Sequence, residues 1–189
     1  DTPTRAIYKQ YAQLLLAPND KKFTFDGTDS EKIYVMNFNR ARMREKLDPG
    51  NWQITLQEPG ADSSHSLELI DDSGQGLSAF GTANNTLAGG GSRVYQVVSG
   101  SINMSDDHPD FGKKVGDVIY GLVYPDAGII ILDPSKLTAA SSSGGIGLPL
   151  YRTALSSESP GANNLANLNN IFEALESGSF FRARSEEEV

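Results

Sequence analysis

Four segments of the chain have the apolar patterning of β-strands. Trp52–Gln57 alternates apolar and polar residues, which places Trp52, Ile54 and Leu56 on one face. Two more segments, Lys32–Phe38 and Arg93–Ile102, are rich in β-branched and aromatic residues, and the fourth, Ser66–Ile70, is closed by the turn signal Asp71-Asp72-Ser73-Gly74. We predict a strand at each, with Ser66–Ile70 paired to Trp52–Gln57 across a long loop.

A hairpin is the strongest local prediction. Asp117–Tyr124 and Ile129–Leu132 are both dominated by β-branched and aromatic residues, and Pro125–Gly128 separates them. Proline fixes φ and glycine permits a positive φ, which suits a tight connection. Asp48-Pro49-Gly50 has the same turn chemistry ahead of Trp52.

Each end of the chain has helical periodicity. Residues 4–17 place Ile7, Tyr11, Leu14 and Leu15 at helical spacing, with Thr4 as a cap and Pro18 as a stop. Residues 163–177 repeat the pattern, and Gly178 suits the C-terminal cap. The apolar face expected for this second helix is Leu165, Leu168, Ile171, Phe172 and Leu175. A final strand is predicted from Phe180 onwards.

Between these elements, polar and glycine-rich stretches predict loops at residues 20–30, 74–92 and 105–114, and one or two helical turns at 39–47. Residues 138–160 are rich in Ser and Gly and predict a long excursion or linker. The expected organisation is an N-terminal helix and loop (1–30), a β core (31–137), that loop (138–160), and a C-terminal helix and strand (161–189). The fold class is therefore all-β or β-dominated α+β, as an antiparallel sandwich or small barrel with an amphipathic helix near each terminus.

Composition narrows the function classes. The chain has 189 residues, a net charge of −8 and no cysteine. A net acidic chain is a poor match for nucleic acid as the main partner, because phosphate binding needs clustered Lys and Arg. The absence of cysteine excludes disulfides, thiolate metal sites and thiol nucleophiles. No apolar run approaches the roughly 20 residues that a membrane-spanning helix needs.

Candidate chemistry is sparse. Asp106, His108 and Asp110 have side chains that bind divalent cations, but no wider metal motif accompanies them, so a solvated acidic loop is the favoured interpretation. Asp71-Asp72-Ser73-Gly74 lacks the closing acid of a calcium loop and predicts a turn. No Gly-x-Ser-x-Gly sequence occurs. We therefore expect no catalytic residue, metal or cofactor, and no enzymatic activity.

Candidate interface residues are basic or aromatic. Arg40, Arg42 and Arg44 form a basic run in an acidic chain, which suits a solvated helix face or a docking patch for an acidic neighbour. Arg182 and Arg184 precede three glutamates, a segregation of charge typical of a segment that pairs with, or continues into, another element. Trp52 completes the set of candidates. The chain is also expected to be part of a longer polypeptide.

Two strings carry a resemblance to a known family. Residues 33–56, IYVMNFNRARMREKLDPGNWQITL, and residues 180–189, FFRARSEEEV, resemble segments of large virion structural proteins of contractile-tailed phages, especially those infecting marine cyanobacteria. The resemblance implies a tail or baseplate component that is assembled in the host cytoplasm, resides in the particle and binds other virion proteins or copies of itself. It transfers no active-site residue.

Three hypotheses follow for the function. An assembly module of a tailed-phage virion is preferred. A receptor- or carbohydrate-binding β-module of a tail fibre is the alternative, and it requires a concave cluster of aromatic side chains. A cell-wall hydrolase is the third, and it requires a carboxylate pair or a metal triad.

Overall fold

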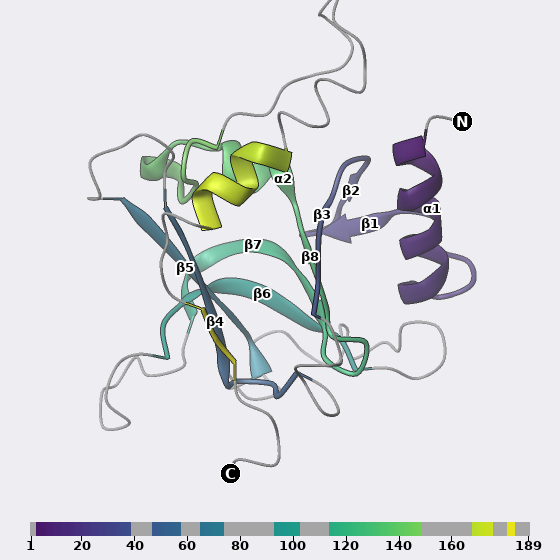
Figure 1. The fold of residues 1–189 in the computed structure, drawn as a ribbon, viewed down its shortest axis with the longest axis horizontal. Helices are drawn as coiled ribbons and strands as arrows, with labels where there is room; N and C mark the ends of the chain where they lie inside the picture. The colour runs from purple at the N-terminus through teal and green to yellow at the C-terminus, as the bar shows by residue number, and fades with distance from the viewer. Residues whose placement is uncertain are drawn as a thin grey trace, which may run out of the picture.

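A computed structural model describes residues 3–38, 47–57, 65–73, 93–102, 114–148, 168–175 and 181–183. Seven strands of this part form one antiparallel sheet in the order β3-β8-β7-β6-β5-β4-β9, which curls into a half-barrel (Figure 1). The strands are β3 (Tyr34–Asn37), β4 (Trp52–Gln57), β5 (Ser66–Asp71), β6 (Tyr95–Gly100), β7 (Lys114–Tyr124), β8 (Ile129–Leu132) and β9 (Phe181–Ala183). The predicted β-dominated class with antiparallel pairing is confirmed.

The predicted hairpin is present, and β7 carries a bulge beside it. Tyr124 pairs with Ile129 and Gly121 with Leu132. On its other side, β7 pairs Gly121 with Val97 and Ile119 with Val98, so Tyr120 is an extra residue. A bulge of this kind increases the local twist of a strand and helps the sheet to curl.

The N-terminal residues form a helix and a small hairpin. Helix α1 spans Pro3–Leu15, and β1 (Phe23–Phe25) pairs with β2 (Thr28–Ser30). Asp26 and Gly27 between these strands both have positive φ, 50° and 73°, as a two-residue type I′ turn requires. The prediction of a loop over residues 20–30 is therefore wrong, because the Asp-Gly turn closes a hairpin there.

The segment after β8 is packed against the sheet. Helix α2 (Pro134–Thr138) begins with Pro134, and the Asp133 carboxylate accepts a hydrogen bond of 3.0 Å from Ser135 N. After a 3₁₀ turn at Ser141–Ser143, the chain returns to α2, where Leu148 N donates to Leu137 O at 3.1 Å. Residues 138–148 are thus not a linker, because Ile146 and Leu148 are buried in the core.

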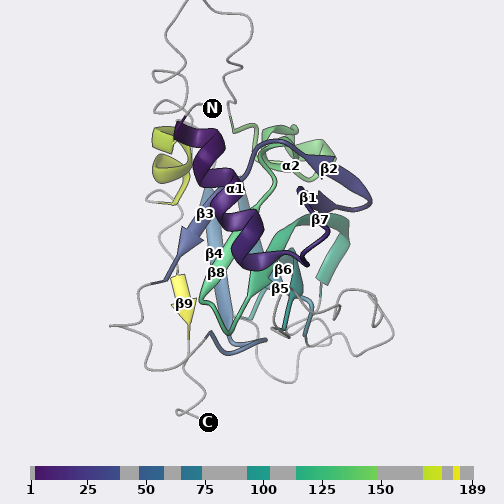
Figure 2. The ribbon, with the colours of Figure 1, turned by 90° about the vertical axis from the view of Figure 1, so that its right-hand side faces the viewer.

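The two larger of three apolar clusters among the described residues lie on the two faces of the sheet. The main core collects residues of every strand from β4 to β8, together with Leu47, Leu137, Ile146 and the helix over residues 168–175. The N-terminal core joins α1 and β1 to residues of β7 and β8, including Tyr124, Ile129 and Ile131. Figures 1 and 2 show α1 on one side of the sheet and α2 with the helix over 168–175 on the other. Because both faces of β8 are covered, all four of its residues are buried.

The remaining strand predictions are also confirmed, apart from their end residues. Trp52, Ile54 and Leu56 are all buried, and β5 pairs with β4 as expected. The final strand is β9, which lies beside β4 at the sheet edge. Residues 39–46 of the expected helical turns, the loop at 74–92, residues 105–113 of the third loop and residues 149–160 of the expected linker fall outside the described residues.

Candidate functional site

Helix α1 is attached by one stripe and exposes another. Tyr8, Ala12 and Leu15 recur at i, i+4 and i+7 and belong to the N-terminal core. Ile7 and Leu14 lie on the adjacent face and are 50% and 60% exposed. Helical spacing grouped these two residues with Tyr11 and Leu15 as one apolar face, but of the four only Leu15 is buried, and Tyr11 is half-buried. Because both stripes have helical spacing, only contact with the sheet decides which one is buried.

The helix over residues 168–175 has the same division. Ile171 and Ala174 are buried in the main core, whereas Leu168 and Phe172 are 46% and 55% exposed. The predicted face, which joined Leu168 and Phe172 to Ile171, is therefore only partly buried. The described part of the chain thus has four large apolar side chains on outward faces of two helices. Exposed apolar side chains that cluster at helical spacing are characteristic of protein-binding surfaces.

Tyr8 fixes the position of α1. Its hydroxyl donates to Ser30 O at 2.6 Å and accepts from Phe23 N at 3.0 Å. Since Phe23 and Ser30 are paired across the β1–β2 hairpin, the hydroxyl connects both strands to the helix. The Tyr8 ring also packs edge-on against Phe23, with 5.6 Å between ring centroids. These contacts orient α1 so that Ile7 and Leu14 face outwards.

A buried carboxylate holds the turn that precedes β4. Both oxygens of Asp71 accept from Gly50 N, at 3.0 and 2.9 Å, and Ser73 N donates to Oδ1 at 3.0 Å. Burial raises the pKa of the Asp71 carboxyl, and these hydrogen bonds oppose the rise. The Trp52 indole lies near enough to favour the charged carboxylate, although its Nε1–H makes no hydrogen bond with good geometry. The donors around Asp71 come from Gly50 and Ser73, and Gly74 of the predicted turn lies outside the described residues.

A second buried polar side chain, that of Gln53, also makes hydrogen bonds that stabilise the fold. Gln53 is fully buried, and its Oε1 accepts from Ser101 Oγ at 3.1 Å and from Ile102 N at 2.8 Å. These bonds join β4 to the end of β6. Sequence inspection missed Gln53, because its alternation with Trp52 and Ile54 suggested a solvent-facing position. The glutamine belongs to the structural interior.

Of the six candidate interface residues predicted from the sequence, the structure describes two. Trp52 is 1% exposed and packs in the main core, so its side chain offers no surface to a partner. Arg182 lies in β9 and pairs with Gln53 of β4. Arg40, Arg42, Arg44 and Arg184 lie outside the described residues. The apolar surface available to a protein partner is therefore formed by the exposed side chains of the two helices and not by Trp52.

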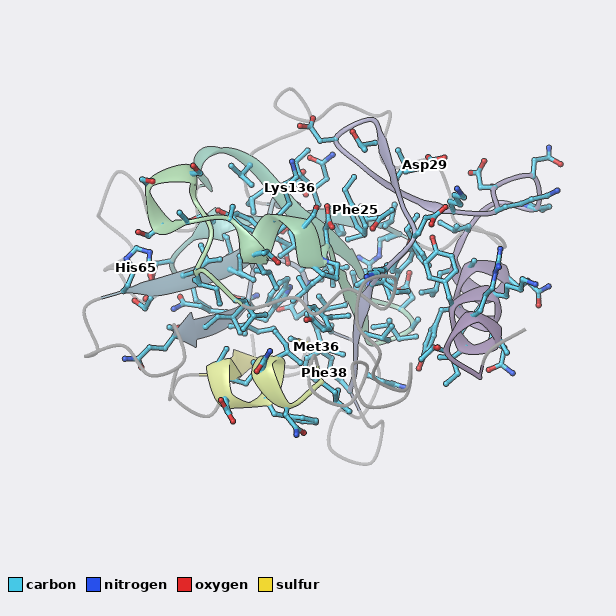
Figure 3. All side chains as sticks on the ribbon, turned by 90° about the horizontal axis from the view of Figure 1, so that it is seen from above. Phe25, Asp29, Met36, Phe38, His65 and Lys136 are labelled. Atoms are coloured by element: carbon cyan, nitrogen blue, oxygen red, sulfur yellow. The ribbon has the colours of Figure 1, made fainter. Side chains whose placement is uncertain are left out.

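The other candidate chemistry can be placed only in part. Across the ranges that the structure describes, no three His, Asp or Glu side chains gather as they would around a metal ion. Asp106, His108 and Asp110 fall outside those ranges. His65 is half-buried directly before β5 (Figure 3). None of the helices in the described part combines the length and apolarity of a membrane span.

Comparisons with protein-family models, curated proteins and solved structures return no match to this chain.

Proposed function

We propose that this chain is a structural module of a tailed-phage virion, in the tail or baseplate region, and that it works through protein–protein interfaces. The observation that carries the assembly part is the exposure of Ile7, Leu14, Leu168 and Phe172 on two helices whose other faces are buried. The virion part rests on the resemblance of residues 33–56 and 180–189 to virion structural proteins.

The sheet supports this proposal. Strand β3 is an edge of the sheet, and it bonds to β8 and its turn, with Phe38 N donating to Gly128 O at 2.9 Å. No other strand of the described residues pairs with β3. Edge strands offer backbone donors and acceptors to neighbouring chains, so assembly through β-strand addition is open to this module.

The tail-fibre alternative has less support. Sugar-binding modules present clustered aromatic rings, and Phe172 is the one aromatic side chain in the exposed class among those described. A single exposed ring on a helix suits a protein partner better than a glycan.

Immunogold electron microscopy of gradient-purified phage particles, with an antibody raised against the chain, tests the proposal. We expect gold labelling at the tail, and cross-linking mass spectrometry should join lysines of the N-terminal residues to other virion proteins. Absence of the chain from intact, purified particles would refute the virion assignment. Binding of labelled chain to host cells or glycans without its incorporation into particles would favour the alternative.

A further inference from the structure

Two exposed apolar stripes lie on different sides of the molecule. The first, the α1 stripe, consists of Ile7, half-buried Tyr11 and Leu14. The second, the C-terminal stripe, consists of Leu168 and Phe172. Their helices pack into different cores on opposite faces of the sheet (Figures 1 and 2). A single chain therefore cannot cover one stripe with the other, but two copies can.

The charges of the two helices favour a contact between unlike stripes. Helix α1 contains Arg5 and Lys9 and no acidic residue, whereas residues 168–175 contain Glu173 and no basic residue. Pairing either helix with its own copy would bring like charges together. Pairing α1 with the other helix brings helices of opposite charge together; Arg5 and Lys9 lie across α1 from its stripe, so this attraction acts at long range and weakens with salt.

The distribution of charge over the whole chain acts in the same direction. Residues 1–33 carry five basic and five acidic side chains, whereas residues 34–189 carry eleven basic and nineteen acidic ones. The neutral N-terminal part of one copy can therefore approach the acidic remainder of another without net repulsion, whereas two acidic remainders repel each other.

The stripes also match in size and in the polarity of their borders. Ile7 and Leu14 are separated by about 10 Å along α1, and Leu168 and Phe172 by about 6 Å, at 1.5 Å per residue. Phe172 can therefore lie over Tyr11, between Ile7 and Leu14. The α1 stripe is bordered on its outer side by Ala6, Gln10 and Gln13, which are exposed and uncharged. On this side of the α1 stripe, no charged side chain must be stripped of water when the stripes meet.

We propose that copies of this chain associate head to tail, with the α1 stripe of one copy docked on the C-terminal stripe of the next. This inference rests on the proposed assembly function and names its partner as a second copy. A contact between two different surfaces leaves one surface free on each end, so association continues into a ring or a row. The contact is small beside the roughly 1,200–2,000 Å² that stable complexes bury, so it depends strongly on concentration.

Two single variants and their mixture test this arrangement by sedimentation of the full chain. The wild type should show a weight-average mass that rises above the 20.3 kDa of one chain as concentration increases. Leu14→Asp removes the α1 stripe and Phe172→Asp removes the C-terminal stripe, so each alone should remain monomeric. Their mixture retains one intact surface of each kind and should form dimers, limited to twice the mass of one chain.

Several outcomes overturn the proposal. One is a wild type that stays monomeric throughout its soluble range. Another is a Phe172→Asp variant that still associates with itself, which would indicate that α1 pairs with α1. A mixture that stays monomeric would also refute the contact. Ser142→Asp, on an exposed 3₁₀ turn, controls for added charge and should associate as the wild type does.

Folding and function can be separated in the same set of experiments. Circular dichroism should match the wild type, because Leu14 and Phe172 are exposed; if Leu14→Asp unfolds, Ile7→Asp tests the same stripe. A wild-type chain that is monomeric but present in purified particles refutes the head-to-tail contact and leaves the proposed function standing. A chain that self-associates but is absent from particles refutes the virion function instead.

Discussion

Tyr8 joins α1 to the β1–β2 hairpin through a single hydroxyl group. That hydroxyl serves Phe23 N and Ser30 O together, so Tyr8→Phe leaves a backbone donor and a backbone acceptor without their partner. We expect a loss of about 1–2 kcal/mol in the free energy of unfolding, since the site is only partly buried. Urea unfolding measures this loss. Tyr11→Phe is the matched control, because its hydroxyl makes no hydrogen bond with the described residues, and an equal loss in both would contradict the role of Tyr8.

Tyr34 has the opposite character, because its hydroxyl is buried with no hydrogen-bond partner among the described residues. Burial raises the pKa of this hydroxyl from 10.0 to about 12. Between these values the unfolded chain loses a proton that the folded chain keeps, so Tyr34 lowers stability as pH rises above 10.0. Tyr34→Phe removes the buried hydroxyl that lacks a hydrogen-bond partner, and with it the loss of stability from its titration above pH 10.0. We expect the variant to match or exceed the wild type by about 1 kcal/mol at neutral pH, with a larger gap above pH 10.0.

Urea unfolding at neutral and alkaline pH provides the comparison for Tyr34. A variant that is clearly less stable than the wild type at neutral pH would mean that the hydroxyl has a partner and contributes to folding. A gap that does not widen in alkali would contradict the raised pKa.

Asp71 makes stability depend on acid pH. Burial raises its pKa above 3.8, so just above that value the folded chain holds a proton that the unfolded chain has released. Stability therefore falls as pH rises through this window and is recovered as pH is lowered. An asparagine cannot titrate and offers one acceptor oxygen to Gly50 and Ser73. Asp71→Asn should cost about 1–3 kcal/mol at neutral pH, and its deficit against the wild type should grow towards pH 3.8.

Chemical denaturation across the acid range measures the Asp71 effect. Asp26→Asn, in the exposed β1–β2 turn, controls for the loss of one negative charge. A deficit that shrinks on acidification would show that the folded pKa lies below 3.8 and would reverse the sign of the argument.

At the scale of elements, the β7–β8 hairpin depends on close contact between two backbones. A Cβ placed on Gly121 would lie 2.0 Å from Ile131 O, closer than any side chain can tolerate. Gly121→Ala must therefore shift β7 or β8 next to the Tyr120 bulge, and we expect a loss of about 3 kcal/mol or more. Thermal unfolding measures this, with Ser99→Ala in β6 as a control strand substitution. A loss below about 1 kcal/mol would mean that the strands can separate locally at little cost.

The sequence predicts elements well where pattern and turn chemistry agree. Strands β4 to β8 follow from alternation or β-branched runs, because one or both faces of each must be buried. The β1–β2 hairpin was predicted as a loop because its strands have three residues each, although Asp26-Gly27 was a usable signal. Helix α2 was missed because residues 133–137 were assigned to the β core, whereas Asp133 caps a short helix that begins at Pro134.

The exposed faces of the helices could not be predicted in the same way. In α1, Ile7 and Leu14 have the same seven-residue spacing as Tyr8 and Leu15, so periodicity identifies two equivalent stripes. The sheet contacts only one of them, through Tyr124, Ile129 and Ile131 of the N-terminal core. Which of the two stripes stays exposed is decided by how α1 packs against the sheet. The exposed surface could therefore be identified only from the structure, whereas the helix could be predicted from the sequence.

At the scale of the whole molecule, the two cores are separate and unequal. Of the residues that the structure describes, sixteen are buried in the main core and eight in the N-terminal core, and α1 with β1 supplies half of the eight. Removal of residues 1–30 should leave the seven-stranded sheet in place but uncover its second face, where Tyr124, Ile129 and Ile131 are now almost fully buried. An apolar face of that kind binds hydrophobic dyes and drives association.

We therefore expect the chain without residues 1–30 to retain most of its β-sheet circular dichroism, to bind the dye ANS, and to aggregate at concentrations where the full chain is soluble. Adding Ile129→Ser and Ile131→Ser to the shortened chain should reduce dye binding, since both residues face the N-terminal core. Complete loss of the β-sheet signal would show that the main core does not fold without α1 and the β1–β2 hairpin. A shortened chain that keeps its sheet, stays monomeric and binds no dye would mean that other parts of the chain can cover this face. In that case α1 would be free to serve assembly with both of its stripes.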